Sequence, residues 1–194
     1  MILKIVTSNL GKVEEFRKAF ADAGIGTEHV PAAYDEIQTA DLEEVVRWGM
    51  RELRNKGMKN FIIDDSGLFI DSLKGFPGVY SSYVQKTVGN DGIIDLMRGR
   101  KDRGAEFRCC IGCDIKGETI VVTGVCRGRI MKKELGTEGF GFDPIFSADG
   151  ERTFAELPME EKNVISHRGI AINLLIKELE KSDMILGHNA PRER

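Results

Sequence analysis

The chain has 194 residues, enough for one domain or two closely packed lobes around a sizeable core. Hydrophobic residues make up 41% and charged residues 30%, and no apolar run approaches the ~20 residues of a membrane helix. The first residues are too polar for a signal peptide, so we expect a cytoplasmic protein that does not insert into membranes. A net charge of −3 gives no general attraction for nucleic acid, and we interpret the basic run 98–104 as a solvated loop.

Hydrophobic periodicity and turn residues predict an alternation of strands and helices that gives way to a long hairpin. In chain order we expect a strand at about 2–7, a helix at 11–23, a strand at 27–31, a helix at 41–57 capped by Asp41, two strands in 60–73 separated by a polar break, short helices in 75–97, a hairpin at 105–130, a short strand after 143 and a helix from Ser166. This order predicts an α/β fold with a mixed, partly antiparallel sheet. We expect residues 1–186 to form a single domain and the tail 187–194 to be disordered.

The four cysteines include a Cys-x-x-Cys pair that is typical of zinc or redox sites. Cys110 and Cys113 fall on a predicted strand, where residues three apart point to opposite faces. No second pair and no nearby histidine completes a set of four ligands. We therefore expect buried, reduced cysteines.

The first polar group lies where the first strand meets the first helix, in Thr7, Ser8, Asn9 and Lys12. This is not a Walker A loop, because the required glycine and the Ser or Thr after the lysine are missing. A phosphate at this helix N-terminus would gain main-chain N–H donors and the ammonium group of Lys12. The alternative is that Asn9 only caps the helix and Lys12 is solvated.

The second group is the pair Asp64 and Asp65, which follows three apolar strand residues. Carboxylate oxygens at the end of a strand suit a hard cation such as Mg²⁺. Neighbouring strand residues face opposite sides, so we expect only one of the two at a site. The alternative is a turn in which both carboxylates bind nearby backbone.

The third group joins a Gly and aromatic loop to a cationic turn. Its members are Phe140, Phe142, Asp143, Lys162, His167 and Arg168. The phenyl rings offer faces for a base, the glycines allow close approach, and the turn offers donors, so the group suits a nucleotide. The alternative is that the rings belong to the core and the cations to the surface.

Taken together, these motifs resemble the inosine triphosphate pyrophosphatase family, which hydrolyses non-canonical purine nucleoside triphosphates. The resemblance rests on four ordered blocks over roughly 165 residues: TSNLGK, DDSGL with GFPGVYSS, GFGFDPIF and EEKNVISHRG. It implies a two-lobed α/β fold with a long mixed sheet flanked by helices, a nucleotide cleft between the lobes and a homodimer. The implied reaction converts ITP, dITP or XTP to the monophosphate and pyrophosphate, with Mg²⁺ as cofactor.

The resemblance also implies roles for individual residues. Asp65 is the expected catalytic carboxylate, and Glu36 and Asp65 the expected magnesium ligands. The expected substrate contacts are Thr7, Ser8, Asn9, Leu10, Gly11, Lys12, Ser66, Phe140, Gly141, Phe142, Asp143, Lys162, His167 and Arg168. Two rival hypotheses remain: a phosphatase that releases orthophosphate, and a nucleotide or RNA sensor without turnover.

Overall fold

The computed structural model describes residues 2–32 and 37–182, and these residues build one central sheet with helices on both faces. The strands are β1 (Ile2–Val6), β2 (Gly26–Val30), β3 (Phe61–Ile70), β4 (Pro77–Gly78), β5 (Gly104–Ile115), β6 (Glu118–Ile130) and β7 (Phe146–Ser147). The helices are α1 (Leu10–Asp22), α2 (Leu42–Asn55), α3 (Ser81–Thr87), α4 (Gly89–Leu96), α5 (Met159–Ile165) and α6 (His167–Lys181). The predicted tail 187–194 lies outside the described residues.

The seven-stranded sheet is mixed, as the sequence predicts. Its order is β2-β1-β3-β5-β6-β7, with β4 also paired to β3. β1 runs parallel to β2 and β3, whereas every other pair is antiparallel. The α/β fold class is therefore confirmed.

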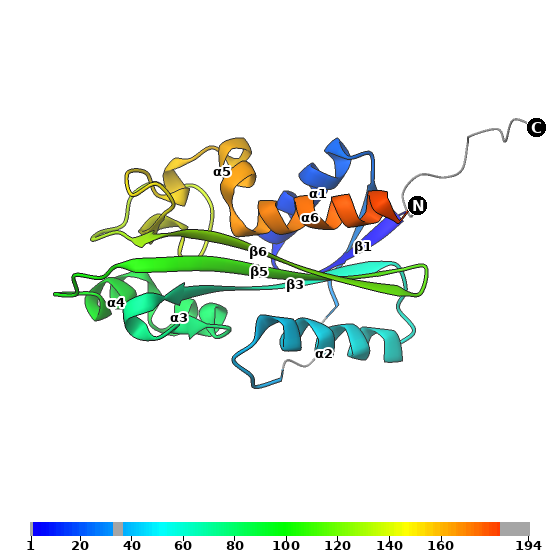
Figure 1. The fold of residues 1–194 in the computed structure, drawn as a ribbon, viewed down its shortest axis with the longest axis horizontal. Coiled ribbons are helices and arrows are strands. Elements are labelled where there is room, and N and C mark those ends of the chain that lie inside the picture. Colours follow the sequence, from blue (N-terminus) through cyan, green and yellow to red (C-terminus); the bar gives the residue numbers. More distant parts are fainter. Residues whose placement is uncertain (1, 33–36, 183–194) are drawn as a thin grey trace, which may run out of the picture.

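The helices form a layer on each side of the long strands (Figure 1). α1, α5 and α6 cover one face, and α2, α3 and α4 lie on the other. One core cluster joins α1 and α6 to β1, β3 and β5, and a second packs α2 against the opposite face. A third fills the far end, where Phe107 stacks on Phe154 and meets Phe146 edge to face. The sheet is thus buried on both faces along most of its length.

Side-chain caps start the three long helices at the predicted positions. The Asp41 carboxylate accepts a hydrogen bond from the Glu43 N–H at 2.8 Å and begins α2. The side chains of Asn9 and Ser166 cap α1 and α6 in the same way. Each cap satisfies N–H groups that have no partner inside the helix, which fixes where the helix begins.

The predicted polar break at residues 64–67 is wrong, because β3 continues through it without interruption. Each residue of β3 from Phe61 to Ile70 is paired with β5. This long partner strand supplies hydrogen bonds that a turn would have had to find locally, so the polar residues stay extended.

The cysteine prediction is confirmed. All four thiols are free and buried. Cys113 belongs to the core under α1 and α6, and Cys110 to the core under α2, so the two point to opposite faces. Among the described residues, no group of three or more histidine, cysteine or acidic side chains has the arrangement of a metal site.

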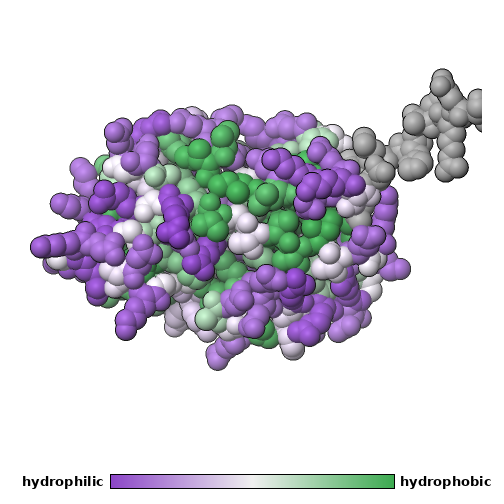
Figure 2. All heavy atoms as spheres, in the orientation of Figure 1, coloured by the Kyte–Doolittle hydropathy of each residue, from purple (hydrophilic) through white to green (hydrophobic). Residues whose placement is uncertain are grey.

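The surface differs between the rim and the centre of the face shown in Figure 2. Hydrophilic residues surround an apolar area that lies over β6 and α6 in this view.

In the basic run 98–104, Arg100 and Arg103 donate hydrogen bonds to main-chain carbonyls, so these two arginines hold the loop against the body of the protein. No described helix has both the length and the apolarity to cross a membrane.

Candidate active site

A gap on one edge of β3 creates the site. β5 occupies the whole of the other edge, from Phe61 to Ile70. On the open edge, β1 pairs only with Phe61 and Ile62, and β4 only with Leu68 and Phe69. Residues 63–67 therefore have no strand beside them there, within the described part of the chain. This gap brings Asp64, Asp65 and Ser66 to the wall of a cavity.

The cavity has a volume of about 580 Å³, which is in the range of sites for small molecules. It gathers residues from the end of β1, the start of α1, the middle of β3, helix α3, the loop before β7 and the turn before α6. The lining residues are Val6, Thr7, Ser8, Asn9, Lys12, Ala32, Asp64, Asp65, Ser66, Val79, Ser81, Ser82, Gln85, Lys86, Phe107, Phe140, Gly141, Phe142, Asp143, Lys162, His167 and Arg168.

The start of α1 presents a cation to this cavity. The Asn9 side-chain oxygen accepts hydrogen bonds from the N–H groups of Gly11 at 2.9 Å and Lys12 at 3.3 Å. The Lys12 ammonium lies 3.0 Å from Asp64 Oδ2. Asn9 thus caps the helix, as one alternative predicted, but Lys12 is not the solvated residue that the same alternative required.

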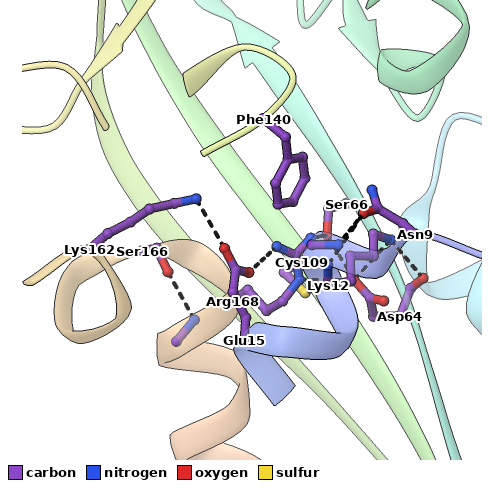
Figure 3. Close-up of polar contacts among 12 residues, drawn as sticks. Asn9, Lys12, Glu15, Asp64, Ser66, Cys109, Phe140, Lys162, Ser166 and Arg168 are labelled. Atoms are coloured by element: carbon purple, nitrogen blue, oxygen red, sulfur yellow. Dashed lines mark hydrogen bonds and ion pairs between the residues drawn. The ribbon is translucent and has the colours of Figure 1, made fainter. Parts of the chain in front are cut away.

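Buried ion pairs continue from this point into the protein (Figure 3). Arg168 Nε lies 3.3 Å from Asp64 Oδ2, and its guanidinium also pairs with Glu15. Lys162 Nζ lies 3.0 Å from Glu15 Oε1 and 2.8 Å from Asp143 Oδ2. Lys162 and Arg168 are both buried, so the alternative that these cations belong to the surface is wrong.

The network contains three cations and three carboxylates, so their formal charges balance. Burial raises the pKa of Asp64, but the attraction of Lys12 and Arg168 outweighs burial and lowers the pKa to about 2. The Asp64 and Glu15 carboxylates strengthen the charged form of Arg168, whose pKa rises despite its burial. These shifts favour the charged forms of Asp64 and Arg168, whereas burial outweighs the attraction of Lys162 at Asp143 and raises the pKa of that carboxyl. A polyanion would therefore meet fixed positive groups that are already paired with carboxylates.

The ring of Phe140 lies above this network (Figure 3). Its centroid is 5.1 Å from Lys162 Nζ and 5.6 Å from the guanidinium carbon of Arg168. A Cβ on Gly11 would come within 2.8 Å of the ring, so only glycine leaves room for it. The Phe140 N–H donates to Asp143 Oδ2 at 2.8 Å, which holds the loop in place. Phe140 is therefore an aromatic surface beside paired cations.

Phe142 and His167 are more deeply buried than Phe140. Phe142 lines the cavity, but it is only 3% exposed and packs in the third core cluster, so it belongs mainly to the core. His167 stacks on Phe107 with ring centroids 4.6 Å apart. Burial, together with the charges of Arg168 and Lys162, lowers the pKa of His167 well below its usual value. The imidazole is therefore neutral at pH 7.

The expectation that only one of the adjacent aspartates reaches the site is wrong. Strand alternation does hold: Asp64 shares the α1 and α6 face with Ser66, whose hydroxyl donates to Asp64 Oδ2 at 3.1 Å. Asp65 is opposite Cys110 in the strand pair and shares the α2 face. Because the sheet is open at this point, both faces border the same cavity. Asp64, which strand alternation puts on the opposite side of the strand from Asp65, is the partner of the cations.

Other predicted residues have different positions. Leu10 and Gly11 do not line the cavity; Leu10 is 72% exposed, and Gly11 supports Phe140 instead. Glu36, the predicted metal ligand, lies outside the described residues. The remaining predicted substrate contacts all line the cavity.

Sequence reasoning missed Glu15 and the wall formed by α3. Glu15 follows another glutamate on an amphipathic helix, a pattern that indicates a solvated face, and only its buried partners reveal its role. Ser81 and Ser82 end the GFPGVYSS block but had no expected role, and Gln85 and Lys86 lie beyond that block in a segment without a recognisable motif.

Comparison with known proteins places this geometry in a family. The sequence pattern that defines the Ham1 family matches residues 3–178, nearly the whole chain. This protein belongs to the Ham1 family. The resemblance found in the motifs is thereby confirmed.

Named relatives and a solved structure match along almost their full length. The dITP/XTP pyrophosphatase of Pyrococcus horikoshii is 48% identical over 181 residues, which cover 93% of this chain and 97% of the relative. The dITP/XTP pyrophosphatase of Thermococcus kodakarensis is 50% identical over 173 residues, which cover 89% of this chain and 94% of the relative. The structure of the Staphylococcus aureus Ham1 protein has a TM-score of 0.79 at 31% identity, covering 94% of this chain and 100% of its own.

The Ham1 cavity also collects buried polar atoms that lack a partner. Six such side-chain atoms occur among the described residues, and three of them belong to residues that line the cavity. These are Asp64 Oδ1, Gln85 Oε1 and His167 Nδ1. A buried polar atom without a hydrogen bond is costly, so the cluster indicates a ligand that supplies the missing partners.

Proposed function

We propose that this protein hydrolyses non-canonical purine nucleoside triphosphates such as dITP, ITP and XTP to the monophosphate and pyrophosphate. The observation that carries the proposal is that one cavity joins the start of α1, the paired cations Lys12, Lys162 and Arg168 and the ring of Phe140, in a chain 48% identical over 181 residues to a dITP/XTP pyrophosphatase. The reaction breaks a phosphoric anhydride bond, so the protein is a hydrolase.

The arrangement supports a division of the cavity into two ends. The triphosphate lies along Thr7, Ser8, Asn9 and Lys12, where hydroxyl and amide groups and the ammonium group of Lys12 bind its oxygens. The base stacks on Phe140, beside Lys162 and Arg168. This orientation places the α-phosphorus near the middle of β3, where Asp64, Asp65 and Ser66 lie.

Asp65 is the proposed catalytic residue, because it lines the cavity on the opposite face of β3 from the cations that neutralise Asp64. Its carboxylate accepts the proton of a water molecule as the water oxygen attacks the α-phosphorus. The bond from the α-phosphorus to the bridging oxygen breaks, and pyrophosphate leaves with that oxygen. Lys12 offsets the charge that develops on the phosphate oxygens.

The described residues fit a magnesium ion held largely by its substrate. Mg²⁺ keeps several waters and needs only one or two carboxylates besides phosphate oxygens. Asp64 Oδ1 has no hydrogen-bond partner among the described residues, so one carboxylate oxygen at the cavity wall could still bind a water of such an ion. We propose Asp65 and Glu36 as the ligands, and the ion would supply charge neutralisation that the balanced site lacks.

Base selection belongs to the turn before α6. Ser166 caps α6 and fixes where the helix begins, and the neutral His167 that follows it lines the cavity and offers a ring N–H. A 6-oxo purine accepts from such a donor, whereas the 6-amino group of adenine does not. We therefore propose hypoxanthine and xanthine as the favoured bases.

The test is a panel of ITP, dITP, XTP, ATP and GTP with magnesium, scored separately for pyrophosphate and orthophosphate. The proposal requires pyrophosphate from ITP and XTP with kcat/KM at least ~10-fold above that for ATP and GTP. Orthophosphate as the main product would establish the rival phosphatase, and binding without turnover would establish the sensor.

Two further properties follow from the family resemblance. We propose a homodimer, which light scattering after size exclusion would test by a mass of twice the monomer. We also propose that the enzyme acts in the cytoplasm, because its nucleotide substrates are formed there; cell fractionation tests this location.

A further inference from the structure

Gln85 of α3 forms part of the cavity wall beside the aromatic loop. Its side-chain Nε2 donates a hydrogen bond to the main-chain carbonyl of Gly141 at 3.1 Å. Gly141 directly follows Phe140, the proposed platform for the base. Gln85 therefore joins the wall formed by α3 to the loop that carries this platform.

The orientation of the Gln85 amide is fixed by this contact. The carbonyl of Gly141 can only accept a hydrogen bond, so the NH₂ end of the amide must face it. The oxygen end of the amide therefore points away from the Gly141 carbonyl. That oxygen, Oε1, is buried and has no partner among the described residues.

We propose that Gln85 Oε1 accepts a hydrogen bond from the N1–H of a 6-oxo purine and makes Gln85 a specificity-determining residue. The assignment rests on the proposed function, because it concerns the base of the triphosphate that the same cavity takes. Gln85 would thus supply a hydrogen-bond acceptor for the base in addition to the donor proposed at the start of α6.

The chemistry of the purine edge explains the selectivity. Hypoxanthine, xanthine and guanine carry a hydrogen on N1, whereas N1 of adenine is an acceptor. An adenine base would set its N1 against Gln85 Oε1, and both lone pairs would remain without a donor in a desolvated site. Gln85 therefore discriminates against adenine but not against guanine, which must be rejected elsewhere.

Neighbouring polar groups are already engaged. The Ser81 hydroxyl accepts from the Leu68 N–H at 2.8 Å and donates to the Gly78 carbonyl at 2.7 Å. The Asp143 carboxylate binds Lys162 and the N–H of Phe140. Gln85 Oε1 is thus a neutral acceptor with unused capacity next to the aromatic loop.

Two substitutions of Gln85 distinguish its proposed role as an acceptor for the base from a role that only holds the loop through the Gly141 carbonyl. Gln85→Met keeps the length of the side chain but removes both the donor and the acceptor. Gln85→Glu keeps acceptor oxygens but loses the donor to Gly141. Tyr83→Phe on the same helix is the control, because Tyr83 is 69% exposed and does not line the cavity. Thermal unfolding of each variant verifies the fold.

The measurement is kcat/KM for pyrophosphate release from ITP, GTP and ATP. For Gln85→Met we expect the ITP to ATP ratio to fall ~10- to 100-fold, with the ITP to GTP ratio unchanged. For Gln85→Glu all rates fall together and the ITP to ATP ratio stays within a few-fold of wild type, as it does for Tyr83→Phe.

An unchanged ITP to ATP ratio in Gln85→Met, in an enzyme that still turns over, would overturn the assignment and leave Gln85 as a loop anchor. An ITP to GTP ratio that falls as far as the ITP to ATP ratio would also overturn it, because guanine shares the N1–H. Wild-type enzyme that releases no pyrophosphate from any of the three nucleotides would overturn the proposed function and this assignment with it. The two failures are therefore distinguishable.

Discussion

Substituting Asp64 and Asp65 one at a time should show that Asp64 contributes mainly to the stability of the fold and Asp65 mainly to catalysis. Asp64 is 6% exposed, and its Oδ2 lies 3.0 Å from Lys12 Nζ and 3.3 Å from Arg168 Nε. Asp64→Asn keeps the shape of the side chain but removes the charge that both cations face. The change therefore leaves buried positive charge without compensation.

The size of the effect follows from the pKa of Asp64. Burial raises this pKa and the two cations lower it, with a net fall from 3.8 to about 2. The difference corresponds to about 2 kcal/mol in the free energy of unfolding. Because the folded pKa lies below the unfolded pKa, this stability is fully present above about pH 4 and disappears as the pH falls towards 2.

Urea unfolding of wild type, Asp64→Asn and Asp65→Asn at pH 7, 5, 4 and 3 measures this contribution. At pH 7 we expect Asp64→Asn to lose at least ~2 kcal/mol, or ~4–8 °C in Tm. The difference from wild type should shrink below pH 4. Asp65→Asn should cost less stability, because an Asn oxygen can still accept from the Ser66 N–H, while pyrophosphate release falls ~10²–10⁴-fold.

Three results would each refute a part of this reasoning. A loss of stability in Asp64→Asn that is the same at pH 7 and pH 3 would show that the charge of Asp64 does not stabilise the fold. Equal destabilisation by the two variants would show that the buried ion pairs are not specific to Asp64. Full turnover in Asp65→Asn would remove Asp65 from the proposed chemistry.

Three further predictions concern other parts of the site and core. Glu15→Gln should destabilise the protein by ~3–5 kcal/mol and lower kcat/KM, because Glu15 compensates two buried cations, whereas the exposed neighbour Glu14→Gln should leave urea unfolding and kinetics near wild type. Gly11→Ala should raise KM for ITP ~10-fold with little change in kcat, because the new Cβ displaces the Phe140 ring; equal KM values would contradict the packing. Burial raises the pKa of the cysteine thiols to about 11 or higher, so iodoacetamide at pH 8 should label the native protein slowly and all four thiols in urea, as mass spectrometry can count.

Local sequence determined the helix boundaries and the location of the binding motifs. The caps at Asn9, Asp41 and Ser166 are short-range hydrogen bonds, so residue type and spacing suffice to predict them. The fate of the cysteines followed from strand alternation, which is also local. Motif resemblance identified the family because four blocks had the right order.

Tertiary structure decided how the charges are paired and which faces meet the cavity. β3 is continuous because β5 pairs with all of it, a partnership between residues about 35 to 53 positions apart in sequence. Asp64 reaches the site because β1 and β4 leave the opposite edge of β3 open. Glu15 joins cations that are 147 and 153 positions away. Such contacts depend on how elements distant in sequence pack together, so the residues next to each side chain in the sequence do not predict its partner.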